Sequence, residues 1–105
     1  MEISSSNRPP EEPSYRKDFQ RSVDLFEKSF REVQNSTFDA QKNQYVNVMQ
    51  SSLSVMQEAA NGMVNKHLAE LKNKLSTDLD AYIENPNTEH TQQVMKDIRE
   101  IKNSD

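Results

Sequence analysis

Residues that end helices are almost missing from the middle of this chain. No proline occurs between Pro13 and Pro86, and the one glycine of the sequence is Gly62. Proline removes a backbone donor and glycine adds backbone freedom, so both oppose a helix, whereas the other residue types tolerate one. No stretch alternates apolar and polar residues between turn residues, as strands do. The sequence therefore predicts an all-α fold.

The first helix is predicted over residues 15–34, after a Ser-, Pro- and Glu-rich tail at residues 1–13 that is expected to be disordered. Its apolar residues are separated by steps of four and three, the spacing of a coiled-coil seam. The seam consists of Phe19, Val23, Phe26, Phe30 and Val33. Tyr15 extends this stripe by one turn, and Leu25 widens it. The opposite side of the helix is charged and is expected to face solvent.

Two short segments are predicted to join the helices. After the first helix, Ser36 is followed three residues later by Asp39, which has the form of a capping box. Later in the chain, Pro86 pushes Asn85 out of the helical conformation, and Thr88 is expected to cap the helix that follows. Both segments favour antiparallel packing of the neighbouring helices.

The central segment has an apolar stripe that runs through Gly62 nearly in phase. The stripe consists of Val46, Met49, Leu53, Met56, Ala60 and Met63, then Val64, Leu68, Leu71, Leu75, Leu79 and Tyr82. Its register slips by about one residue near Met63, as a stutter does in a coiled coil. Since a loop normally resets the helical phase, we expect one long helix over residues 38–84, about 70 Å in length. A break at Gly62 is the alternative.

These elements predict one architecture. A last helix over residues 89–102 carries Val94, Ile98 and Ile101 on one side. Short helices at the two ends then fold back on the long one. We expect an elongated antiparallel hairpin or three-helix bundle with coiled-coil character, in a single helical domain at residues 14–105.

Composition argues against several classes of function. The net charge of −4 disfavours nucleic-acid binding, and the absence of cysteine leaves no thiolate chemistry and no disulfides. His67 and His90 have no partner at metal-ligand spacing, and Asp78 and Asp80 point to different sides of a helix. We therefore expect no enzyme, cofactor or metal. Without a membrane-spanning run or a signal sequence, a cytoplasmic location is expected, and export without a cleaved signal stays open.

Residues 43–65 are the most unusual segment, because Glu58 is their only charged residue. A helix with one side in solvent usually carries charges on that side, and the methionines here add adaptable apolar surface. We predict a contact surface for another protein, or for a second copy of this chain. Its residues are Phe26, Phe30, Val48, Met49, Ser52, Leu53, Val55, Met56, Ala59, Ala60, Gly62 and Met63. The alternative is that this segment is merely the most buried part of a monomeric bundle.

The segment Leu79–Thr88, continued by Val94, Ile98 and Ile101, resembles the helix–Asn-Pro-turn–helix of type III secretion needle subunits and related small secretion proteins. Because this chain carries a whole additional helix before residue 38, the resemblance better suits the small helical chaperones or accessory proteins of such systems. It implies a chaperone, adaptor or accessory subunit of a bacterial secretion system. A homo- or hetero-oligomer is expected from the composition, because a compact core is hard to build from this chain alone. The alternative is a subunit that assembles with itself into a filament or oligomer.

Overall fold

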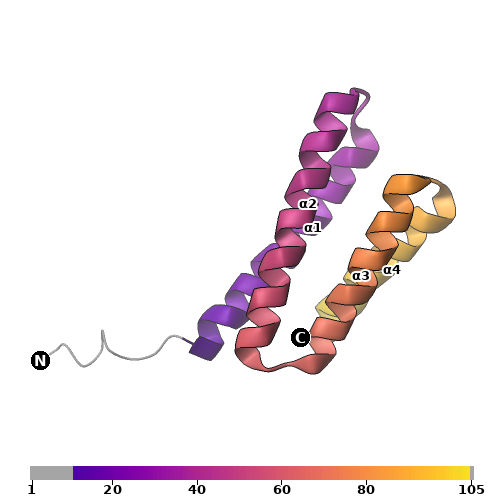
Figure 1. Cartoon of the computed structure of the whole chain (residues 1–105). Helices are drawn as coiled ribbons and strands as arrows, with labels where there is room; N and C mark the ends of the chain where they lie inside the picture. Colours follow the sequence, from indigo (N-terminus) through magenta and orange to yellow (C-terminus); the bar gives the residue numbers. More distant parts are fainter. Residues whose placement is uncertain (1–10, 105) are drawn as a thin grey trace, which may run out of the picture.

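The computed structural model describes the backbone of residues 11–104 and the side chains from residue 15 onward. This part of the chain forms four α-helices: α1 (Glu11–Asn35), α2 (Asp39–Met63), α3 (Lys66–Glu84) and α4 (Thr88–Ser104). The predicted all-α fold is confirmed (Figure 1). The α1 helix begins four residues before its expected start, so residues 11–13 of the predicted tail are helical. Residues 1–10 of that tail lie outside the described residues.

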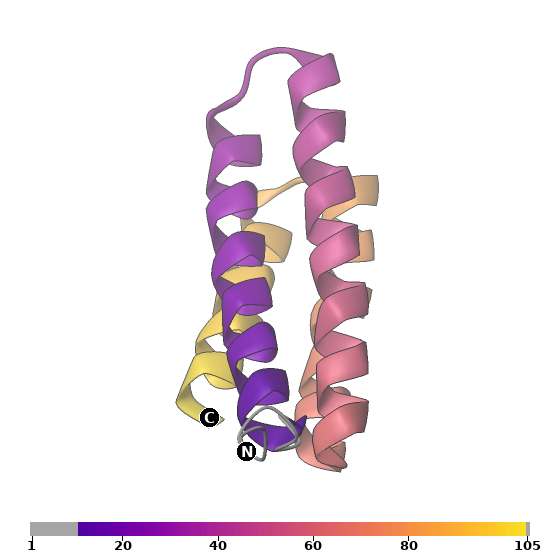
Figure 2. The same ribbon diagram turned by 90° about the vertical axis from the view of Figure 1, so that its left-hand side faces the viewer.

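The helices pair as two antiparallel hairpins, α1 with α2 and α3 with α4 (Figures 1 and 2). The α1/α2 hairpin is the longer one, and its connection projects beyond the turn between α3 and α4. Contacts between the hairpins join α2 to α3 and α1 to α4. The described chain is elongated, with principal extents of 56 × 27 × 17 Å.

All five seam residues predicted for the first helix are buried, and they form the centre of one continuous core. The other helices contribute Met49, Leu53, Met56, Ala59 and Ala60 from α2, Leu68, Leu75, Leu79 and Tyr82 from α3, and Val94, Ile98 and Ile101 from α4. The rings of Phe30 and Tyr82 meet edge to face, with centroids 4.9 Å apart. This contact joins the two hairpins across the core.

The predicted central helix over residues 38–84 is wrong, because the chain turns back at residues 64 and 65. Val64 adopts a left-handed conformation, with φ 53° and ψ 45°. Its N–H donates to Asn61 O at 3.1 Å, and the N–H of Asn65 donates to Ala60 O at 3.0 Å, a Schellman-type end. The Asn65 side chain then accepts from the Leu68 N–H and caps α3.

The physical reason for the break is burial. In a single helix of that length, the apolar stripe of the second half would not pack against the first hairpin. A chain of 105 residues has too little apolar surface to leave that stripe out of its core. Folding α3 back places Leu75 and Leu79 in the common core, fully buried. The alternative break at Gly62 is also wrong, since Gly62 lies inside α2.

Two predicted helix caps are replaced by neighbouring residues. The residue before α2 is Phe38, in an extended conformation and with no side-chain cap, so the predicted capping box at Ser36 does not form. Ser36 instead donates its N–H to Glu32 O at 2.9 Å and continues the end of α1. At α4, the Asn87 side chain accepts from the His90 N–H at 2.7 Å, so Asn87 is the cap in place of Thr88.

Gly62 has a packing role that explains its presence inside a helix. A Cβ at this position would lie 2.5 Å from Cε2 and Cζ of Tyr15, on the facing helix α1. A real Cβ does not approach another carbon that closely, so the glycine allows the tyrosine ring to lie against the α2 backbone. The close contact offsets the poor helix propensity of glycine.

A double-mutant cycle tests this contact. Alanine is about 1 kcal/mol more favourable than glycine inside a helix. We expect Gly62→Ala to raise the free energy of unfolding by about that amount when Tyr15 is replaced by Ala. In the presence of Tyr15 we expect no gain, because the ring must move. Chemical denaturation of the four proteins measures both values. An equal gain in the two backgrounds would show that the ring does not need the space.

Candidate functional site

Small residues allow α1 and α2 to approach closely. Ser22 and Ser29 on α1, and Ser52 and Ala59 on α2, each lie seven residues apart and are buried. The Ser22 and Ser52 hydroxyls donate to the carbonyl four residues earlier, at 2.8 and 2.9 Å. Because these hydroxyls are satisfied within their own helices, they can be buried without a partner on the facing helix.

Because α1 and α2 lie close together, larger apolar side chains do not fit between them and lie on the outside of the hairpin. Leu25 of α1 is 47% exposed, and Val55 of α2 is 40% exposed. Val48, seven residues before Val55, is half-buried. We call Leu25, Tyr45, Val48 and Val55 the outer face. Figure 2 views the hairpin from the side that α3 and α4 leave open.

A groove runs along the outer face between α1 and α2. Its volume is about 340 Å³, and it is lined by Leu25, Lys28, Ser29, Glu32, Tyr45 and Val48. No residue of α3 or α4 contributes to it. The floor is apolar or small, while Lys28 and Glu32 place opposite charges at its edge. This combination suits the apolar side of a helix better than a small charged ligand.

Most residues predicted for partner binding are covered by the chain itself. Eight of them are buried among the helices: Phe26, Phe30, Met49, Ser52, Leu53, Met56, Ala59 and Ala60. A partner reaches these side chains only if the helices separate. Gly62 lies against Tyr15, and Met63 is half-buried. Of the predicted set, Val48 and Val55 are the two that belong to the outer face.

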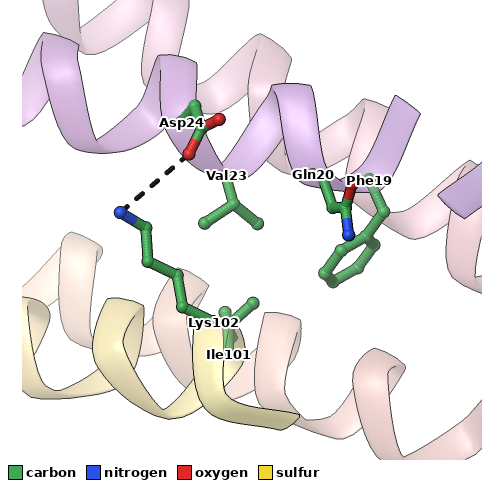
Figure 3. Close-up of a pocket in the computed structure, with 6 residues that line it drawn as sticks. All are labelled: Phe19, Gln20, Val23, Asp24, Ile101 and Lys102. Carbon is green, nitrogen blue, oxygen red and sulfur yellow. Dashed lines mark ion pairs between the residues drawn. The ribbon is translucent and has the colours of Figure 1, made fainter. Parts of the chain in front are cut away.

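A second groove separates α1 from α4 (Figure 3). Its volume is about 380 Å³, and Phe19 and Val23 face Ile101 across it. Lys102 of α4 closes one side, with its Nζ 3.9 Å from Asp24 Oδ1 and also paired with Glu27. Because Lys102 and Asp24 are solvent-exposed, the ion pair between them holds this seam only weakly.

Two carboxyl groups meet where α3 packs on α4. Asp97 is 1% exposed, and Oδ2 atoms of both Asp97 and Asp78 are buried without a hydrogen-bond partner. Burial, together with the hydrogen bond and the charge of Asp78, raises the pKa of Asp97 to about 7, although Gln93 and Lys74 act in the opposite direction. Gln93 donates to Asp97 Oδ1 at 3.2 Å, and Lys74 Nζ lies 3.7 Å from the same atom. A proton held by Asp97 can be donated to the Asp78 carboxylate, and this shared proton gives both orphan oxygens a partner.

Sequence reasoning missed this carboxyl pair because it considered Asp78 only with Asp80, its neighbour in the chain. A signal was present at Asp97, which lies three residues after Val94 and four before Ile101, inside the apolar stripe of α4. An acidic residue at a stripe position is buried if the stripe is buried. The contact with Asp78 depends on how α3 and α4 pair, which periodicity does not give.

Neither histidine belongs to a cluster of ligands. His90 Nδ1 lies 2.6 Å from Asn85 O, within the turn before α4. His67 Nε2 lies 3.4 Å from the Ser104 hydroxyl at the surface. Among the residues that the structure describes, no group of three His, Asp or Glu side chains is arranged to hold a metal ion. In the same residues, no helix combines the length and apolarity needed to cross a bilayer.

Comparison with known proteins does not assign the site. No protein-family model matches the sequence, and neither a curated protein nor a solved structure matches the chain. The outer face and the carboxyl pair therefore rest on the geometry of this structure.

The carboxyl pair predicts an unusual dependence of stability on pH. Since the pKa of Asp97 is higher in the folded chain than the ordinary 3.8, folding binds a proton over this interval. Its stabilising contribution is therefore complete below pH 4 and is lost as the pH rises through about 7. We expect Asp97→Asn, which is always neutral, to raise the free energy of unfolding at pH 8 relative to the native chain, by on the order of 2 kcal/mol.

Urea unfolding at pH 5 and pH 8 measures this effect. Asp80→Asn, an exposed change on the same helix as Asp78, is the control and should leave the pH dependence unchanged. An Asp97→Asn variant with the same pH dependence as the native chain would contradict the shared proton.

Proposed function

We propose that this chain is a non-enzymatic protein–protein interaction module, and that it binds a helix of another protein along the outer face. One observation carries the proposal. Leu25 and Val55 of the α1/α2 hairpin expose large apolar side chains, and the groove beside Leu25 is lined by residues of α1 and α2 alone. Scattered apolar residues are normal on a surface, but Leu25 lines one groove with Tyr45 and Val48. Val55 follows Val48 by seven residues, on the same side of α2.

The spacing of the outer face suits a helical partner. Val48 and Val55 are two helical turns apart, about 10 Å along α2. An amphipathic helix presents apolar residues at the same interval and can place one on each side of Leu25. The opposite charges of Lys28 and Glu32 favour one direction of the bound helix. From Tyr45 to Val55, α2 carries no charged residue, so desolvation costs less there than on a charged surface.

The carboxyl pair favours a structural role over catalysis. General acid–base chemistry needs a carboxyl that reaches a substrate in a cleft. Asp97 is almost completely buried, and its contact with Lys74 joins α3 to α4. We therefore assign the pair to the contact between α3 and α4, in keeping with a protein that acts through its surface.

A role as a chaperone, adaptor or accessory subunit of a bacterial secretion system is part of this proposal. It is supported by the resemblance of the segment that contains the Asn85-Pro86 turn to small type III secretion proteins. A subunit that assembles with itself through the outer face is the alternative function. The experiment below distinguishes the two by the identity of the cross-linked chain.

Site-directed photo-cross-linking tests the proposed surface. A photoreactive phenylalanine analogue at Val55 should form an adduct with another protein in the host cell. The same residue at Ile83 is a matched control, because Ile83 is also 40% exposed but lies on α3. Adding Val48→Lys should reduce the Val55 adduct at least about tenfold, since a buried lysine charge is costly, while circular dichroism shows unchanged helix content.

Three outcomes have distinct meanings. An adduct with a different protein supports the interaction module, and its mass spectrum identifies the partner. An adduct with a second copy of this chain supports the self-assembling alternative. Equal adducts from positions 55 and 83, or unfolding of the Val48→Lys variant, would contradict a specific outer face.

A further inference from the structure

The connection between α2 and α3 is made of residues that fit it poorly. It has two residues, Val64 and Asn65, and Val64 carries the left-handed conformation at φ 53°. β-branched residues rarely adopt this conformation, because the Cβ substituents crowd the backbone. The Val64 side chain is also 81% exposed, so no packing compensates for the strain. The one glycine of the chain, which would relieve it, lies two residues earlier.

The same residues are compatible with a continuous helix. No proline lies between α2 and α3, and the apolar stripe runs through the connection nearly in phase. In a continuous helix, Val64 would lie one turn before Leu68, on the side that carries the stripe. Returning two residues to right-handed helical angles would therefore remove the strain and join α2 to α3.

Such an opening would detach the α3/α4 hairpin from the α1/α2 hairpin. The seam between α1 and α4 is interrupted by a groove of about 380 Å³, and the ion pair of Lys102 with Asp24 beside it is exposed to solvent (Figure 3). Opening would expose buried residues on both hairpins, among them Leu53 and Leu75. The exposed surface of the α1/α2 hairpin fits an α3/α4 hairpin, and the reverse also holds. A second opened copy of the chain supplies both.

We propose that this chain forms a domain-swapped dimer with a second copy of itself, in which Val64 and Asn65 are helical. In this dimer, the α3/α4 hairpin of each copy packs against the α1/α2 hairpin of the other. The swap recreates the contacts of the monomer and replaces a strained turn with two helical residues in each chain. Short connections under strain are known to favour this exchange. The dimer does not use the outer face and is independent of the proposed function.

Cross-linking of two introduced cysteines tests the swap. The chain has no native cysteine, and Ser54 on α2 and Ser76 on α3 line one groove of about 450 Å³. In the monomer these two positions lie at the same groove within one chain. In a continuous helix these positions are 22 residues apart, about 33 Å. In the dimer, position 54 of one copy therefore lies near position 76 of the other copy.

We expect a short bis-maleimide to cross-link the Ser54→Cys/Ser76→Cys protein differently in two fractions from size-exclusion chromatography. The monomer should give intrachain products, and the dimer formed at high concentration should give a covalent dimer on a denaturing gel. A dimer with only intrachain products would overturn the proposal, as would the absence of any dimer at millimolar concentration.

Two substitutions in the connection should shift the dimer in opposite directions. Val64→Gly relieves the left-handed residue and weakens the helix, so it should raise the dimer dissociation constant at least about tenfold. Asn65→Ala removes the acceptor for the Leu68 N–H and favours a continuous helix, so it should lower that constant. Val55→Lys, on the outer face, should leave it unchanged. A dissociation constant that responds to Val55→Lys but to neither connection variant would overturn the proposal in favour of outer-face association.

Discussion

The close contact of α1 with α2 is the interaction on which the rest of the structure depends. It buries the regular seam of α1 against the methionine-rich side of α2, and small residues at intervals of seven bring the two backbones together. A chain of this size has a limited apolar surface, so a hairpin packed along its full length supplies much of the core. The shorter α3/α4 hairpin is then added to an existing surface.

The same close contact also creates the proposed binding surface. Where Ser29 brings the backbones together, Leu25 and Val48 do not fit between the helices and lie at the outer edge of the contact. The outer face is therefore a geometric consequence of small residues in the interface. The lack of charges in residues 43–65 has two explanations in the structure. Part of this segment is buried inside the chain, and part contributes to the exposed groove.

The second hairpin is held by contacts of a different kind. Lys74 and Gln93 surround a buried carboxyl pair between α3 and α4, and an exposed ion pair of Lys102 with Asp24 closes the seam to α1. Such contacts depend on pH and salt more than apolar packing does. The two-residue connection at Val64 adds strain at the point where the hairpins join. The attachment of the α3/α4 hairpin is thus the feature of the molecule that changes in solution conditions, or mutations, alter most easily.

The helical fold, the seam of α1 and the turn at Pro86 can all be predicted from the amino-acid sequence, because periodicity and proline act through neighbouring residues in the chain. The sequence did not determine the break at Val64, since a continuous stripe is compatible with a straight helix and with a folded one. Burial decided between them, and burial is a property of the whole chain. For the same reason, only the tertiary structure placed Asp97 beside Asp78 and left Leu25 and Val55 exposed while it covered Met56. The sequence of a helix predicts which of its sides is apolar. The neighbour that covers this side depends on how all the helices pack.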